Sequence, residues 1–201
     1  MAESIVQVTE GTGKKLHTWN RTIGANSVED EYVLFGENAL TTYMASIFGS
    51  GATASSHFQL MAGASLKVRV RSIEVFQIGL ATTAAVTYIE LYRLSTAGTG
   101  GTVVTPRPLD TTDAASGATA MALPTVKGTE SLQIALKSFI AIQTVGASTV
   151  MTGPSVVFNF DQPRTKPLII AAGAANGIAL KFLGNAGTTF QANILFDESS
   201  F

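Results

Sequence analysis

The sequence predicts an all-β protein: an antiparallel two-sheet β-sandwich of the jelly-roll type, with one short helix and an extended N-terminal arm. Short segments in which apolar and polar residues alternate recur along the chain. Long amphipathic helices between them, which a doubly wound α/β fold needs, are missing. The connections are irregular, as in the jelly rolls among sandwiches of this size. We expect residues 1–30 to form the arm and residues 31–201 the sandwich domain.

The N-terminal part of the sandwich contains two expected strands and the expected helix. Residues 5–9 and 31–35 have the composition of strands. A later segment has apolar residues at intervals of three and four, as on one face of a helix: Leu40, Tyr43, Met44, Ile47 and Phe48. Gly49 stands where glycine commonly ends a helix. An irregular connection is the alternative for this segment.

The clearest alternation lies in residues 66–71, where three aliphatic residues alternate with three cations. The phase then changes, because Ile73 and Val75 have the same parity as the cations. A slip of one residue moves the apolar set to the other face of a strand. A bulge near Ser72, or a strand that passes from one sheet to the other, would accommodate it.

Further strands bring the expected total to about eight to ten. They are residues 84–95, 132–137 with a continuation to 142, 156–160, 168–170, 178–182 and 190–196. Three polar or glycine-rich segments indicate turns: residues 97–101, 161–167 and 184–187. Residues 105–130 contain three prolines and form a connection too long for a hairpin turn. Such loops inside compact domains are usually functional or disordered, and we expect this one and the arm to contact other molecules.

Charge is scarce in this chain. Charged residues make up 13% of the 201 residues, against about 25% in a typical soluble protein. The net charge is −1, which argues against a basic nucleic-acid binder. Soluble monomers usually carry many mixed charges, so the composition favours burial of surface against other subunits. A monomer coated with threonine and serine is the alternative.

Few residues have the chemistry that catalysis or metal binding needs. The chain has no cysteine, which excludes disulfides, thiolate metal sites and a cysteine nucleophile. His17 and His57 do not have metal-ligand spacing, and no Gly-x-Ser-x-Gly elbow supplies a serine nucleophile. Asp110 and Asp113 offer too few oxygens for calcium, and an aspartate or threonine of this segment is expected to cap a short turn before residues 114–115. We therefore predict no catalytic, cofactor-binding or metal-binding residues.

Three other groups of charged residues have plain structural interpretations. The cationic row Lys67, Arg69 and Arg71 is expected to be solvated or to pair with acids on a neighbouring strand, such as Glu90. A contact with a subunit or partner is the alternative. Residues 11–15, Gly-Thr-Gly-Lys-Lys, lack the spacing of a phosphate loop and indicate a flexible arm. The adjacent acids at positions 197 and 198 are expected to be solvated.

Exposed aromatic residues could stack on sugars, and the candidates are Trp19, Tyr32, Tyr43, Tyr88 and Tyr92. Packing in the core or an interface is the default expectation for them. Residues 38–66 and 138–160 are uncharged and long enough to cross a bilayer, but glycine, serine, threonine and asparagine or proline interrupt them. The N-terminus has no secretory pattern. We expect no membrane segment and synthesis in a cytoplasm.

Three segments together carry a family resemblance. The first joins residues 11–15 to Val-Glu-Asp-Glu-Tyr-Val at 28–33. The second is Leu-Met-Ala-Gly-Ala-Ser-Leu-Lys-Val-Arg-Val at 60–70, running into Ile-Glu-Val-Phe-Gln at 73–77. The third is Ile-Glu-Leu-Tyr-Arg-Leu at 89–94, with Gly-Thr-Gly-Gly-Thr at 98–102 and Pro-Leu-Asp-Thr-Thr-Asp-Ala-Ala at 108–115. With these segments, the chain resembles small virion structural proteins of tailed bacteriophages, of the head-decoration or cement type.

The resemblance implies a non-enzymatic protein on the capsid surface of a virion, made in the host cytoplasm. It implies a homo-oligomer, with a trimer favoured, that binds the major capsid protein and needs no cofactor. A receptor-binding or carbohydrate-binding protein of the phage tail, built on a similar sandwich, is the alternative. An enzyme on a β-sandwich is a further class, and it would need converging carboxylates or a histidine site.

Overall fold

The computed structural model describes residues 18–23, 26–31, 40–50, 56–79, 81, 86–140, 155–162, 166–183 and 188–199. The chain divides into two units, Met1–Ala39 and Leu40–Phe201. In the first unit, β1 (Thr18–Ile23) pairs antiparallel with β2 (Asn26–Glu31). These two strands were not expected from the sequence. The strand expected at residues 5–9 lies outside the described residues, as does most of the one expected at 31–35.

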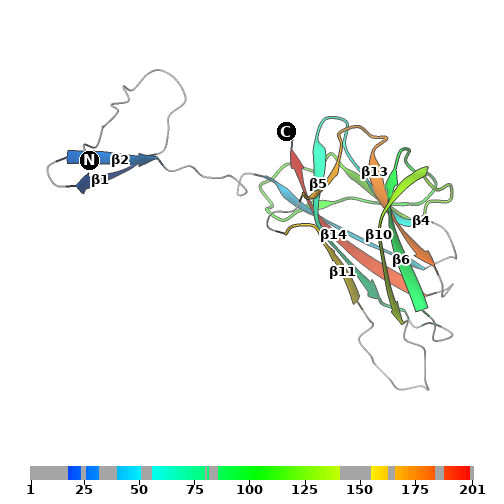
Figure 1. Ribbon diagram of the computed structural model, residues 1–201. Coiled ribbons are helices and arrows are strands. Elements are labelled where there is room, and N and C mark those ends of the chain that lie inside the picture. The colour runs from blue at the N-terminus through cyan, green and yellow to red at the C-terminus, as the bar shows by residue number, and fades with distance from the viewer. Residues whose placement is uncertain are drawn as a thin grey trace. The chain divides into compact units, whose positions relative to one another are not determined.

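The second unit consists of two antiparallel sheets (Figure 1). One, called here the β6 sheet, has the order β10-β6-β13-β4-β9-β7. Its strands are β10 (Glu130–Ile140), β6 (Val86–Leu94), β13 (Gly177–Leu183), β4 (Ser56–Met61), β9 (Thr119–Ala122) and β7 (Thr102–Val104). The prediction of two antiparallel sheets is confirmed.

The other sheet, called here the β14 sheet, has the order β11-β5-β14-β3-β8. Its strands are β11 (Ser155–Asn159), β5 (Lys67–Gln77), β14 (Thr189–Ser199), β3 (Thr42–Ser50) and β8 (Arg107–Pro108). A short strand, β12 (Leu168–Ile170), pairs with the first residues of β5. The expected strands at 84–95, 156–160, 168–170, 178–182 and 190–196 all correspond to strands of these two sheets.

The core lies between the two sheets and is filled by alternate residues of both. The ring of Phe182, on β13, stacks on that of Phe190, on β14, with 4.4 Å between ring centroids and 10° between planes. Phe58 packs its edge against Phe182 at 5.4 Å. Large buried rings contribute strongly to core stability, and this stack joins one sheet directly to the other.

The prediction of a helix over residues 40–48 is wrong, because this segment forms β3. Tyr43, Ala45 and Ile47 point into the core, while Phe48 is exposed on the opposite face. The apolar residues fit a helical spacing, but they also fit a period of two once the small Ala45 is counted as a core residue. Pairing of β3 along nine residues of β14 decides between the two periods.

The slip predicted in residues 66–75 is a bulge within one strand. In the pairing of β5 with β14, Leu195 lies opposite Ser72 and Phe196 opposite Val70. Arg71 is therefore the extra residue, and both Arg71 and Ser72 are partly exposed. A bulge of this kind adds one residue to one strand and shifts the face on which the following side chains lie. The bulge near Ser72 is confirmed, and the strand stays in one sheet.

The long connection at residues 105–130 touches both sheets. Its first part forms β8, which pairs with Tyr43 and Met44 of β3. Its second part forms β9, which pairs with β4 and β7 in the other sheet. This connection is therefore fixed to both layers of the sandwich.

Candidate functional site

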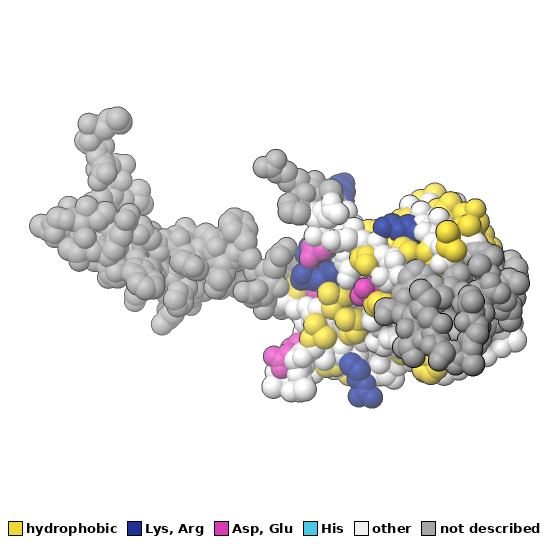
Figure 2. All heavy atoms as spheres, turned by 90° about the horizontal axis from the view of Figure 1, so that it is seen from below, with side chains coloured by type: hydrophobic (Ala, Val, Ile, Leu, Met, Phe, Trp, Pro, Cys, Tyr) yellow, Lys and Arg dark blue, Asp and Glu magenta, His cyan; other side chains and the backbone are white. Residues whose placement is uncertain are grey.

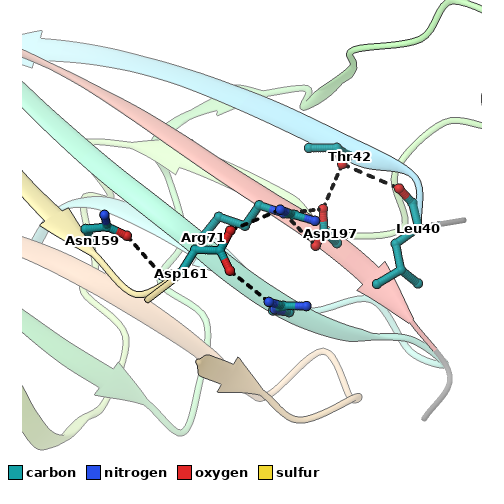
Figure 3. Close-up of polar contacts among 7 residues, drawn as sticks. Leu40, Thr42, Arg71, Asn159, Asp161 and Asp197 are labelled. Atoms are coloured by element: carbon teal, nitrogen blue, oxygen red, sulfur yellow. Dashed lines mark hydrogen bonds and ion pairs between the residues drawn. The ribbon is translucent and has the colours of Figure 1, made fainter. Parts of the chain in front are cut away.

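A network of charges lies at one end of the β14 sheet (Figure 3). Nε of Arg71 lies 2.9 Å from Oδ1 and 2.8 Å from Oδ2 of Asp197. The hydroxyl of Thr42, on β3, donates to Asp197 Oδ1 at 2.8 Å. The Asp197 side chain is fully buried. A buried carboxylate needs such partners, because leaving it uncompensated would cost several kcal/mol, of the order of 3–5.

A second carboxylate extends this network toward solvent. Asp161, which follows β11, lies 2.8 Å from Arg69 Nη2 and 3.1 Å from Arg71 Nη1. Its own backbone N–H donates to the side chain of Asn159 at 2.9 Å. Asp161 thus bridges two arginines of β5, while Asp197 neutralises one of them from the neighbouring strand.

The predicted cationic row is therefore largely neutralised within the protein. The prediction of pairing with acids is confirmed for Arg69 and Arg71, but the acids are Asp161 and Asp197. Glu90, which the sequence analysis suggested, instead lies 3.9 Å from Lys181 on β13. Arg69 and Arg71 thus lie against carboxylates of the protein itself.

Glu198 fixes the long connection to the end of β14. Its Oε1 accepts hydrogen bonds from Ser116 Oγ at 2.8 Å and from the Ala118 N–H at 2.7 Å. Its Oε2 accepts one from the Gly117 N–H at 3.1 Å. The expectation that residues 197 and 198 are solvated is wrong for both: each is buried. The two side chains leave the strand in opposite directions, as successive residues of a strand do.

Two further contacts fix the same loop. The hydroxyl of Tyr43 donates to the carbonyl of Ala114 at 3.1 Å. The N–H of Leu109 donates to the carbonyl of Thr42 at 2.9 Å. Burial raises the pKa of the Tyr43 phenol, and the negative charge of Glu198 raises it further. We call residues 105–118, fixed by these bonds, the anchored loop.

The tip of the anchored loop is a polar turn. Oδ1 of Asp110 accepts hydrogen bonds from the N–H of Thr112 at 2.9 Å and from its hydroxyl at 2.8 Å. These bonds hold the pKa of the Asp110 carboxyl below its usual value, the backbone bond having the larger effect. The N–H of Asp113 donates to the Asp110 carbonyl at 3.1 Å. The expectation that Asp110 caps a turn is confirmed.

Three of the candidate tyrosines lie on β3 and β6 of the second unit. Tyr43 is buried and stacks on Phe196 at 5.5 Å. Tyr92 lies beside Lys181, whose Nζ is 5.3 Å from the ring centroid. Tyr88 is exposed on β6. His57 belongs to β4 and Trp19 to β1, whereas His17, Tyr32 and residues 11–15 lie outside the described residues.

Within the described part of the chain, no group of three or more histidine, aspartate or glutamate side chains is placed to hold a metal ion. The same residues include no helix long and apolar enough to span a membrane. Comparison of the chain with protein-family models, with curated proteins and with solved structures gives no match.

Sequence reasoning missed the partners that build this site. Thr42 and Ser116 are ordinary hydroxyl residues in the sequence, and Asp161 is one acid in an expected turn. Each lies 80 or more residues from the acid or arginine that it contacts. Two sequence signals lay near the site: the cationic row, and the phase change at Ser72, whose bulge gives Arg71 its position beside Asp197.

Proposed function

We propose that this chain is a non-enzymatic virion structural protein that decorates and stabilises a phage capsid. In this proposal it acts as a homo-oligomer on the capsid surface and contacts the major capsid protein. The observation that carries the proposal is the anchored loop. Its tip exposes Leu109 and hydroxyl side chains, and its stem is bonded to Glu198, Tyr43 and Thr42. A loop ordered before binding loses little entropy in a contact.

A jelly roll is part of the proposal, and the strand order supports it. Eight strands of the two sheets, taken in chain order, are β3, β4, β5, β6, β10, β11, β13 and β14. The first pairs with the eighth, the second with the seventh, the third with the sixth and the fourth with the fifth. That pattern arises when a folded ribbon of four antiparallel pairs wraps into two sheets. Jelly rolls of eight strands build many viral capsid domains.

The surface composition is compatible with repeated contacts between subunits. Figure 2 shows hydrophobic side chains at several places on one face, with few lysine, arginine, aspartate or glutamate side chains between them. Thirteen percent of the chain is charged. An oligomer that contacts several subunits of a shell lattice at once gains avidity, even where each single contact is weak. The resemblance described above leads to the same function.

The test is binding of the purified chain to phage shells assembled without a decoration protein. Cosedimentation measures affinity, and calorimetry measures the temperature at which the shells disrupt. Saturable binding that raises this temperature supports the proposal. Leu109→Ser should weaken binding about tenfold or more, because a buried leucine is worth about 1.5–3 kcal/mol. Val126→Ser, a similarly exposed site outside the loop, is the control. No binding by the folded oligomer would overturn the proposal.

The second candidate function is a tail-associated receptor-binding or carbohydrate-binding protein. Two exposed aromatic side chains, Phe48 and Tyr88, favour it, because aromatic faces can stack on sugar rings and lectin domains also use jelly rolls. A glycan array distinguishes the two functions. Glycan binding that Tyr88→Ala or Phe48→Ala abolishes, without shell binding, would favour the tail protein.

A further inference from the structure

β10 is an edge strand of unusual length. It runs over eleven residues at the end of the β6 sheet, and among the described residues it pairs with β6 on one side alone. Register shifts interrupt its first half, but Ala135–Ile140 pairs regularly with Leu91–Val86. A regular edge presents unpaired backbone N–H and C=O groups, which readily pair with another strand.

An apolar surface lies beside this edge. On β6, Val86 and Tyr88 are each 45% exposed, whereas Thr87 and Ile89 between them are buried. On β10, Leu136 is 54% exposed and Ile140 69%. Ile140 lies opposite Val86 and Leu136 opposite Glu90, so all four apolar side chains lie on the outer face of the sheet. We call Val86, Tyr88, Leu136 and Ile140 the β10 patch.

We propose that β10 pairs antiparallel with β10 of a second copy of this chain, about a twofold axis at Ser138. This register places Leu136 opposite Ile140 of the second copy, and Ile140 opposite Leu136. Directly opposite residues in antiparallel strands lie on the same face. The two β10 patches therefore join into one apolar surface across the axis. The inference rests on the homo-oligomer part of the proposed function and names its interface.

Charge disfavours the adjacent register, which has its axis at Lys137. Lys137 is the one charged residue of the regular half of β10, and its ammonium lies 5.2 Å from the centroid of the Phe158 ring. An axis at Lys137 would place two lysines opposite each other, which is destabilising. An axis at Ser138 places each lysine opposite the uncharged Phe139. The patch has no cation of its own, so nucleic acid or an anionic membrane finds no charge to bind there.

Pairing of the two edges brings the outer-face side chains of β10 together. Leu136 and Ile140 of one copy lie beside Ile140 and Leu136 of the other, and each covers part of its neighbour's exposed surface. Val86 and Tyr88 lie one strand farther from the axis, on β6, and extend the joined apolar surface on both sides.

The absence of cysteine from the chain allows a direct test. Ser138→Cys should form an intermolecular disulfide in high yield on mild oxidation, because the two positions face each other on the axis. Val126→Cys, at an exposed position outside the strands of both sheets, is the control and should not. Light scattering should give a mass of two chains, or a multiple of two, for the unmodified protein. Leu136→Lys should raise the dissociation constant of the dimer at least tenfold and so shift the protein toward the monomer.

The outcomes separate this inference from the proposed function. A monomer, a trimer, or an oligomer that Ser138→Cys does not crosslink overturns the β10 pairing, even where shell binding persists. A trimer would agree with the expectation from the resemblance. If Leu136→Lys keeps the oligomer but loses shell binding, the shell covers the patch and the inference fails. A crosslinked dimer that does not bind shells supports the pairing and overturns the capsid function.

Discussion

Arg71 reaches Asp197 because β5 carries one extra residue at that point. No residue of β14 lies directly opposite Arg71, since Leu195 pairs with Ser72 and Phe196 with Val70. The guanidinium is thereby placed over the buried carboxylate, with Nε within 2.9 Å of both oxygens. Bulges commonly re-aim one side chain in this way. Here the bulge supplies the countercharge that allows an acid to be buried in the sheet.

Asp197→Asn should destabilise the protein far more than Asp161→Asn. The first change leaves Arg71 without its buried partner, and removing one member of a buried pair costs about 3–5 kcal/mol. Asp161 is partly exposed, and pairs of that kind contribute about 0–1 kcal/mol. Urea unfolding followed by circular dichroism measures both free energies. Equal losses would show that burial of Asp197 does not determine its contribution.

Glu198→Gln should loosen the anchored loop. The amide has one acceptor oxygen in place of two, so at least one of the bonds from Ser116, Gly117 and Ala118 is lost. A hydrogen bond to a charged group contributes about 1.5–3 kcal/mol. Hydrogen exchange at the amides of Gly117 and Ala118 should become faster. Glu74→Gln, on the partly exposed outer side of β5, is the control, and unchanged exchange in E198Q would contradict the anchoring role.

Phe182→Ala should weaken the contact between the two sheets. The ring stacks on Phe190 and meets the edge of Phe58, and it is fully buried. Truncating a buried phenylalanine costs about 3–5 kcal/mol, which includes the cavity left behind. Thermal unfolding by calorimetry measures this loss. Phe48→Ala removes the same side chain from an exposed position of β3 and should change the stability little. A small effect of F182A would mean that the core repacks.

Thr112→Val should raise the pKa of Asp110. The wild-type pKa lies below its usual value because the Thr112 N–H and hydroxyl both donate to the carboxylate. Valine removes the hydroxyl bond and keeps the backbone bond, which has the larger effect, so the pKa should rise partway. Carbon-13 NMR titration of the Asp110 carboxyl measures it. A depressed folded pKa means that the turn is stabilised above the unfolded pKa, about 3.9, and loses this stabilisation as the pH falls through the folded pKa. An unchanged pKa in T112V would contradict the hydroxyl bond.

Alternation along the chain was sufficient to predict five strands of the second unit: β5, β10, β11, β13 and β14. A strand that packs one face on a core must alternate, and this rule depends on local sequence alone. The bulge in β5 was predictable for the same reason, because a change of phase is visible in the residues themselves. The helix expected at residues 40–48 fails where two periods fit the same residues. Pairing with β14 decides that this segment is a strand, and the sequence of the segment alone does not encode that pairing.

The site depended on contacts that local sequence does not encode. From the sequence, Asp197 and Glu198 are two adjacent acids near the end of the chain, for which solvation is the usual state. The tertiary structure buries both, since Arg71 and Thr42 cover one face of β14 and residues 116–118 cover the other. Strand alternation is a property of one segment, whereas burial of a charge depends on partners brought from elsewhere in the chain. The sequence by itself thus determined the alternating strands and the scarcity of charge. The tertiary structure decided the other strands, which charges are paired and how the anchored loop is fixed.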